Sequence, residues 1–166
     1  MNTIDNLEFD TQIIKIKKRP TADSRTAIGE PSKVDLLESS MMHIDDVKKG
    51  CSFFAIMLLA AGNDHDWTKI KYIDEFYKDY SQKLQGEAFK KAPWFQKHLE
   101  ERHHLNDRCP DDVNLVDVIE RVIDITMAGM ARSGYVYDDE LDAKILQRAY
   151  KNTIQLLQKH IEVGES

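Results

Sequence analysis

Residues 51 to 69 read CSFFAIMLLAAGNDHDWTK and contain the two features that decide how the chain folds. The first is an uncharged apolar run from Cys51 to Ala61, which predicts a central helix buried on all sides. The second is the pair His65-Asp66, which follows this run almost directly. Two polar side chains after a buried helix are costly to bury unless they have partners or a metal ion. The stretch therefore predicts a helical core with a polar site at the end of its central helix.

Periodic apolar residues before and after this stretch predict further helices. The expected helices span residues 32–50, 51–61, 70–84, 93–102, a segment that begins after a cap at Asn114, and 139–161 with Asp138 as its cap. The residues expected to face inward are Leu37, Met41, Ile44, Val47, Ile73, Phe76, Tyr77, Tyr80, Leu115, Val118, Val122 and Ile125. No pattern calls for a sheet, so the fold class is all-α, a bundle of five or six helices in a single domain over residues 33–166.

Residues 1–32 differ in texture and predict an extended N-terminal arm. Residues 13–20 alternate in polarity and can form one strand. The arm is too short to fold alone, so we expect it to lie on the helical body or on a partner subunit. Its basic residues allow two interpretations: Lys17, Lys18, Arg19 and Arg25 form a solvated stretch, or the arm crosses the site and Arg19 or Arg25 contacts substrate.

The composition predicts a cytoplasmic protein. The chain has 166 residues, 42% hydrophobic and 31% charged, with a net charge of −6. Its longest apolar run is too short for a membrane span, and the first residues do not form a signal peptide. The two cysteines stand alone, which predicts reduced thiols. The negative charge argues against a non-specific nucleic-acid binder.

Histidines and aspartates predict a metal site. Five of the six histidines fall between positions 43 and 104. Imidazole and carboxylate together suit hydrolytic and oxidative first-row metal centres, and the lack of paired cysteines removes structural zinc. The candidate ligands are His43, His65, Asp66, His98, His103, His104 and Asp124. His98 and His103 are about 140° apart on a regular helix, so both can face one ion only if the helix ends near Arg102.

Three carboxylates share one face of the helix expected after Asn114. We expect Asp117 to be solvated, because acids on one face are usually surface residues. Asp124 has apolar neighbours and is preferred as the ligand, while Glu120 can orient a ligand from behind.

The order of these residues resembles the HD-domain superfamily of metal-dependent phosphohydrolases. The sequence HDWTK at 65–69 is similar to the His-Asp-x-x-Lys form of the HD-GYP branch, which also has a later His, a His-His pair and a final Asp. A closer likeness is to a small group of phage and bacterial proteins with an HDxSK-like element. In these a tryptophan, a histidine, a His-His pair and an aspartate follow, and the matching residues here are Trp94, His98, His103, His104 and Asp124. The resemblance covers residues 40–130. The chain lacks the Gly-Tyr-Pro element and has a short His98–His103 spacing, which argues against a cyclic-dinucleotide substrate.

The resemblance implies an HD-like helical fold and one or two divalent ions, with Fe, Mn, Mg and Zn all open. His43, His65, Asp66 and Asp124 would hold one ion. His98 and one or both of His103 and His104 would hold a second, with Asp66 as bridge. The implied reaction is hydrolysis of a small phosphorylated compound, such as a nucleotide, with Asp66 and Lys69 as catalytic residues and Lys69 on a phosphate oxygen.

Arg132 and Ser133 are further candidates for substrate binding. They precede Gly134 at an expected helix end two turns after Asp124. Arg132 could hold a phosphate, or it could only complement the helix dipole beside a glycine cap.

Two other functions stay open. A di-iron centre of this kind could activate oxygen, which would make the protein an oxygenase. Alternatively, the metal could staple helices together in a non-catalytic structural or regulatory protein, and a homo-oligomer is compatible with each reading.

Overall fold

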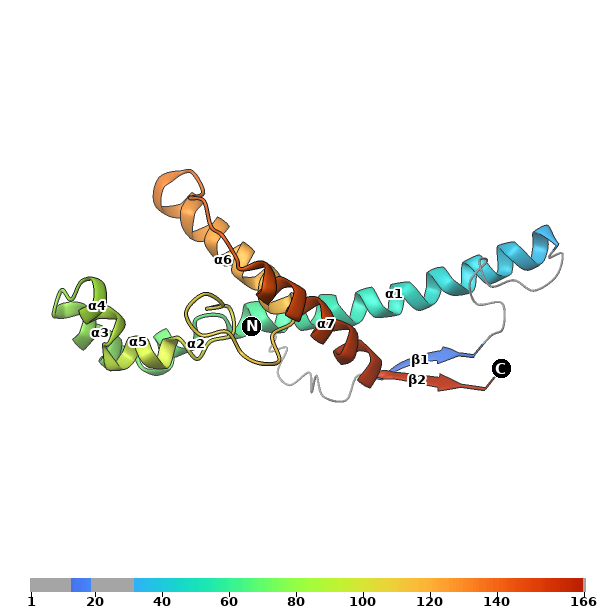
Figure 1. Ribbon diagram of the computed structural model, residues 1–166, viewed down its shortest axis with the longest axis horizontal. Helices are drawn as coiled ribbons and strands as arrows, with labels where there is room; N and C mark the ends of the chain where they lie inside the picture. The colour runs from blue at the N-terminus through green and yellow to red at the C-terminus, as the bar shows by residue number, and fades with distance from the viewer. Residues whose placement is uncertain (1–12, 19–31, 166) are drawn as a thin grey trace, which may run out of the picture. The chain divides into compact units, whose positions relative to one another are not determined.

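The computed structural model describes residues 13–18 and 32–165, and most of them are helical (Figure 1). In chain order the elements are β1 (Ile14–Lys17), α1 (Lys33–Asp64), α2 (Trp67–Lys71), α3 (Ile73–Ser81), α4 (Gly86–Lys90), α5 (Pro93–His98), α6 (Leu115–Ser133), α7 (Ala143–Lys159) and β2 (Ile161–Gly164). The chain divides into two compact units. The first contains the described residues up to 57 and from 154 onward, and the second contains residues 58–153. The candidate site lies within the second unit.

The first unit contains a small parallel sheet. β1 pairs with β2 so that Ile14 lies opposite Ile161. The ring of Phe53, on α1, packs against the ring of His160 with centroids 4.8 Å apart. The strand expected near residues 13–20 is confirmed, whereas the expectation of no sheet is wrong. The helix expected to run to Ile161 ends at Lys159, and Ile161 instead begins β2, which pairs with a strand far away in the sequence.

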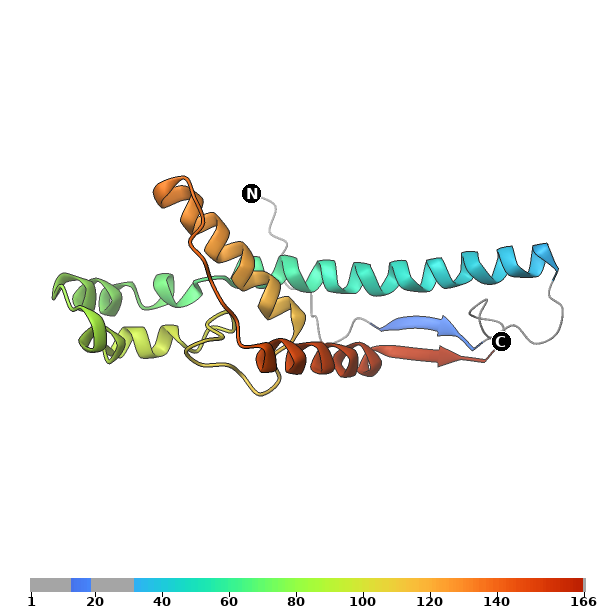
Figure 2. The same cartoon turned by 45° about the horizontal axis from the view of Figure 1, so that its top comes forward.

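α1 is one continuous helix of 32 residues, although the sequence predicts two helices that meet at Gly50 (Figure 2). A glycine inside a helix costs only about 1 kcal/mol relative to alanine, so the good helix formers around it can carry the helix through. The predicted burial is also wrong. The expected inward residues from Leu37 to Val47 are exposed, as is Leu59 in the apolar run, while α1 buries Ser39 and Phe53.

The helix expected over residues 70–84 is represented mainly by α3, because α2 begins earlier, at Trp67, and ends at Lys71. α3 packs against α5 through Phe76, whose ring stacks on Trp94 with centroids 3.9 Å apart. Because α5 has only six residues, it covers little of α3. Ile73, Tyr77 and Tyr80 were expected to face inward but are exposed.

α6 begins as predicted at Asn114. The Asn114 side chain accepts the Val116 N–H at 2.8 Å, and the Asp117 carboxylate accepts the Asn114 N–H at 2.8 Å. This reciprocal pair is a capping box. The helix ends at Gly134, whose φ of 76° is the left-handed conformation that suits a glycine cap.

The start of α7 differs from the prediction. The helix begins at Ala143, and Asp142 accepts the Lys144 N–H at 2.8 Å, so Asp138 is not its cap.

The residues of α6 that were expected to face inward are only partly confirmed, because Val122 is exposed. Within the described residues, no helix combines the length and apolar character needed to cross a membrane.

Candidate metal centre

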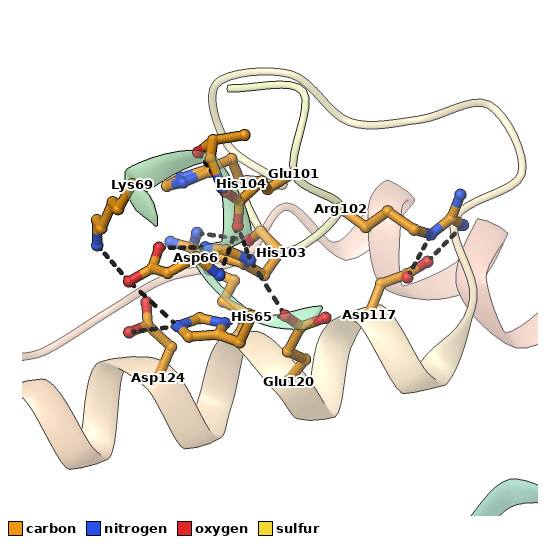
Figure 3. Close-up of polar contacts among 12 residues, drawn as sticks. His65, Asp66, Lys69, Glu101, Arg102, His103, His104, Asp117, Glu120 and Asp124 are labelled. Atoms are coloured by element: carbon orange, nitrogen blue, oxygen red, sulfur yellow. Dashed lines mark hydrogen bonds and ion pairs between the residues drawn. The ribbon is translucent and has the colours of Figure 1, made fainter. Parts of the chain in front are cut away.

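The His65-Asp66 pair forms the turn between α1 and α2. Asp66 adopts a left-handed backbone conformation, with φ 59° and ψ 21°. Aspartate enters this region more readily than most residues other than glycine. The turn brings both side chains to Asp124 of α6 and to the segment that follows α5 (Figure 3).

Donor groups from four parts of the chain converge at this turn. Three overlapping groups could each hold an ion, and the ligand atoms within each lie within 4.8 Å of one another. The groups are His98, His103 and His104; His65, His103 and Asp124; and Asp66, Glu101 and His103. His103 belongs to all three and therefore lies at the common point of the cluster.

The distances between donor atoms fit shared ions. His65 Nε2 lies 3.4 Å from Asp124 Oδ1 and 3.6 Å from Asp66 Oδ2. On the other side, Asp66 Oδ1 lies 3.5 Å from His98 Nε2 and 4.0 Å from His103 Nε2. Ligands about 2.0 to 2.2 Å from one ion, at tetrahedral or octahedral angles, are themselves about 3 to 3.5 Å apart.

Glu120 orients the ring of His65 by contacting Nδ1, the nitrogen that does not face the aspartates. Glu120 Oε1 lies 2.9 Å from His65 Nδ1. Because a carboxylate only accepts, the neutral ring carries its proton on Nδ1 and presents Nε2 to Asp66 and Asp124. Burial lowers the pKa of His65, but Glu120 and the two aspartates outweigh burial and raise it. For Glu120 the signs are reversed. Burial raises the pKa of its carboxyl group, but the nearby histidines outweigh burial and lower that pKa.

His103 supplies a direct test of whether the cluster suits a metal. The residue is only 2% exposed, and among the described residues its Nδ1 is a buried side-chain nitrogen without a hydrogen-bond partner. Glu120 Oε1 lies 3.2 Å away but without hydrogen-bond geometry. Such a nitrogen costs about 1 to 3 kcal/mol unless something satisfies it. A buried imidazole whose Nδ1 lacks a hydrogen bond, at the common point of three donor groups, is suited to metal ligation, so the residues fit an ion.

His98 and His104 complete the nitrogen donors. Their Nε2 atoms lie 3.0 Å apart. Burial, followed by the nearby His103 and His98, lowers the pKa of His104 to about 4. His104 is therefore neutral near pH 7 and able to act as a ligand. α5 ends at His98, so the condition that the helix stops before His103 is met.

Glu101 is the main site residue that the sequence did not predict. It accepts the backbone N–H groups of Asp66 at 2.7 Å and of Thr68 at 2.9 Å, and also the Thr68 hydroxyl. Burial would raise the pKa of Glu101, but hydrogen bonds from His98 and Thr68 outweigh it and lower the pKa to about 2. Its place between His98 and His103 is the only local signal that could have found it.

Asp117 is buried, so the expectation of a solvated carboxylate is wrong. Its two oxygens receive Arg102 Nε at 2.7 Å and Arg102 Nη2 at 2.9 Å. The hydrogen bonds that Arg102 donates to Asp117 are the main cause that raises the pKa of Arg102 above its usual range. The pair holds the chain beside His103 against the start of α6.

Lys69 lies beside the donor cluster. Its ammonium group forms an ion pair with Asp66 Oδ2, and the side chains are 36% and 26% exposed. Because Lys69 is one turn after Asp66, the short helix α2 fixes this arrangement (Figure 3). The result is a partly exposed positive charge next to the cluster.

Other predicted site residues lie elsewhere. His43 is exposed on α1 in the first unit and belongs to none of the three groups.

Arg132 and Ser133 close the end of α6 rather than join the cluster. Arg132 Nε bonds to the Ala128 carbonyl at 3.2 Å and Ser133 Oγ to the Gly129 carbonyl at 3.1 Å. In the arm, Lys17 and Lys18 are exposed, whereas Arg19 and Arg25 lie outside the described residues.

Comparisons of the chain with protein-family models, with curated proteins and with solved structures find no match. The resemblance to the HD-domain superfamily therefore depends on the order of the residues alone. Any function assigned to the cluster has to come from its geometry and chemistry.

Proposed function

We propose that this chain is a metal-dependent phosphohydrolase of the HD type that acts on a small phosphorylated compound such as a nucleotide. The observation that carries the proposal is the convergence of four imidazoles and two aspartates beside a half-buried lysine. The residues are His65, His98, His103, His104, Asp66, Asp124 and Lys69. Mixed nitrogen and oxygen donors suit Mn, Fe and Zn, and the carboxylates also suit Mg.

The position of Asp66 supports two ions. One carboxylate oxygen faces His65, and the other faces His98 and His103. Asp124 and His65 would hold one ion and His98 and His104 the other, and Asp66, which faces both sets, would contribute to each. His103 lies between them and can serve either ion.

The chain's residues divide the chemical tasks. Bound divalent ions would supply an acidified water molecule and would neutralise phosphate oxygens. Lys69 holds a positive charge where an anionic substrate can approach. Glu120 and Glu101 hold the imidazoles in fixed orientations, so that little reorganisation is needed during the reaction.

The donor set also favours a second candidate, a di-iron oxygenase, because four imidazoles suit iron. A metal staple in a structural protein would require the donors but no exposed cation. Lys69 supports an anionic substrate, and for this reason we place hydrolysis of a phosphorylated compound first.

Metal analysis combined with a turnover screen tests the proposal. Purified protein is assayed with added Mn²⁺, Fe²⁺, Mg²⁺ or Zn²⁺ against phosphomonoesters, nucleotides and cyclic nucleotides. Metal-dependent release of inorganic phosphate supports the proposal. Iron that cycles between oxidised and reduced forms without phosphatase activity would favour the oxygenase. Stoichiometric metal without any turnover would favour the staple, and protein that binds no metal would exclude all three.

A further inference from the structure

Asp66 occupies the N-cap position of α2 but does not cap the helix with its side chain. Aspartate is one of the preferred caps, because its carboxylate accepts the N–H groups left unpaired at a helix start. Here the Glu101 carboxylate, 35 residues later in the chain, accepts the Asp66 N–H at 2.7 Å. It also accepts the Thr68 N–H at 2.9 Å. Glu101 thus performs the capping role and leaves the Asp66 carboxylate available to the histidines.

Glu101 also supports the unusual backbone of Asp66. A residue other than glycine at φ 59° costs on the order of 1 kcal/mol or more, and surrounding contacts must hold it there. The hydrogen bond from the Asp66 N–H is such a contact. Without it, the turn that directs Asp66 toward His98 loses a support.

The same carboxylate fixes the proton of His98. Thr68 has one hydroxyl proton, which it donates to Glu101. The Thr68 oxygen, 2.8 Å from His98 Nδ1, therefore accepts from that nitrogen, and Glu101 Oε1 is a second acceptor at 3.3 Å. With its proton on Nδ1, His98 keeps the Nε2 lone pair, which faces Asp66 and His104.

Glu120 makes a parallel but separate arrangement. It orients the ring of His65, whose Nε2 faces Asp124, and it comes from α6 rather than from the segment after α5. The two buried glutamates therefore support different imidazoles. Both approach His103, whose Nδ1 lies 3.2 Å from Glu120 and 3.9 Å from Glu101.

We infer that Glu101 is a positioning residue for His98 and for the Asp66 oxygen that faces it, Oδ1, whereas Glu120 positions the half of the metal centre formed by His65 and Asp124. The inference rests on the metal centre of the proposed function but not on the reaction. Removing the charge of one glutamate is expected to lower the binding affinity for one ion and not for the other.

Cobalt titration of the metal-free protein tests this division. Glu101→Gln and Glu120→Gln keep the side-chain size, and Glu100→Gln is a matched control because Glu100 is adjacent and its side chain is 59% exposed. Binding of Co²⁺ is followed by its visible absorption and by metal analysis. Glu101→Gln is expected to weaken one binding phase about 10- to 100-fold, the same phase that is lost in His98→Ala. Glu120→Gln is expected to weaken the phase lost in Asp124→Ala, and Glu100→Gln to bind as the wild type does.

A purely structural role gives a different result. Glu101→Gln would then lower the melting temperature equally with Co²⁺ and with EDTA, and Co²⁺ affinity would stay at the wild-type value, which overturns the inference. Equal weakening of both phases, or a single phase in the wild type, also overturns the division into halves. Wild-type protein that binds no Co²⁺ would instead refute the metal centre itself.

Thr68→Val keeps the test usable if Glu101→Gln does not fold. This change removes only the hydroxyl between Glu101 and His98 and leaves the Glu101 charge and backbone contacts in place. The His98 phase is expected to weaken, by less than in Glu101→Gln. Unchanged Co²⁺ binding in Thr68→Val would refute the role given to the hydroxyl and with it the inference.

Discussion

Replacing Lys69 by alanine is expected to slow metal-dependent phosphate release about 10- to 1,000-fold while the fold and the metal content stay unchanged. The lysine lies beside Asp66 and is partly exposed next to the donor cluster, so its charge is available to a phosphoryl oxygen. A cation that stabilises the charge developing on the phosphoryl group, in a partly desolvated site, lowers the activation free energy by about 1.4 to 4 kcal/mol. Losing this stabilisation gives the expected range of rates.

The effect on stability is expected to be small. The side chains of the Lys69–Asp66 pair are 36% and 26% exposed, and exposed ion pairs contribute about 0 to 1 kcal/mol. For a chain of this length, 1 kcal/mol corresponds to a change in melting temperature of about 2 to 4 °C. Lys69→Ala should therefore melt within about 4 °C of the wild type.

Turnover, metal analysis and thermal melting are measured on three variants together. Asp66→Ala is expected to lose metal and activity together, because it removes the carboxylate that faces both groups of histidines. Lys90→Ala is the matched control, since Lys90 pairs with Glu87 at the same three-residue spacing but on an exposed surface. Normal turnover in Lys69→Ala would remove the role given to the lysine. Full metal and undiminished activity in Asp66→Ala would refute the proposed mechanism.

The other predictions concern stability. Asp117→Asn is expected to lower the free energy of unfolding by about 2 kcal/mol, because it weakens both the pair with Arg102 and the cap of α6. The measurement is urea denaturation. The control Asp112→Asn, whose side chain is 78% exposed, should lower the free energy of unfolding by less than about 0.5 kcal/mol. Mn²⁺ at 100 times its dissociation constant should add about 2.7 kcal/mol over protein in EDTA and raise the melting temperature about 5 to 10 °C, and identical melting in both would contradict metal binding by the native state. The Glu101 pKa is about 2 when folded against an ordinary 4.5, so its carboxylate stabilises the metal-free protein above about pH 4.5 and the contribution is lost as pH falls toward 2. In EDTA, the difference in unfolding free energy between the wild type and Glu101→Gln should therefore shrink from pH 6 to pH 3, and a constant difference would contradict this account.

Local chemistry accounts for what the sequence predicted well. The capping side chain of Asn114 and the glycine at 134 act within one helical turn, so the bounds of α6 can be read directly from the residues. The His-Asp pair was also informative, because two polar side chains after an apolar helix require partners wherever the chain folds. Its partners His98, His103 and Asp124 were named from residue type and order, and the structure brings them to it.

What the sequence missed depends on contacts between distant residues. β1 and β2 come from opposite ends of the described chain, and no local pattern shows that they pair. Ile73, Tyr77 and Tyr80 of α3 are exposed because α5 is too short to cover them, and the periodicity of α3 cannot reveal the length of its neighbour. Glu101 caps a helix 35 residues away, so its place between His98 and His103 could mark it as a candidate but could not reveal this role. His43 was included because of its place in the residue order and because it lies beside Ile44 and Val47, which were expected to face inward but are exposed.

The capping of α2 by the distant residue Glu101 also links two remote parts of the chain at the site. The Asp66–Glu101 contact closes a loop of 35 residues and the His65–Glu120 contact one of 55. The length-dependent part of the closure entropy, (3/2)RT ln n, is about 3 and 3.5 kcal/mol for loops of these lengths. These contacts are therefore expected to form late, after the helices, and to open first when the ions are removed. An ion bound across the two closures would link distant parts of the native chain, as a disulfide does in other proteins, although both cysteines of this protein are free and the link would last only while the chain is folded.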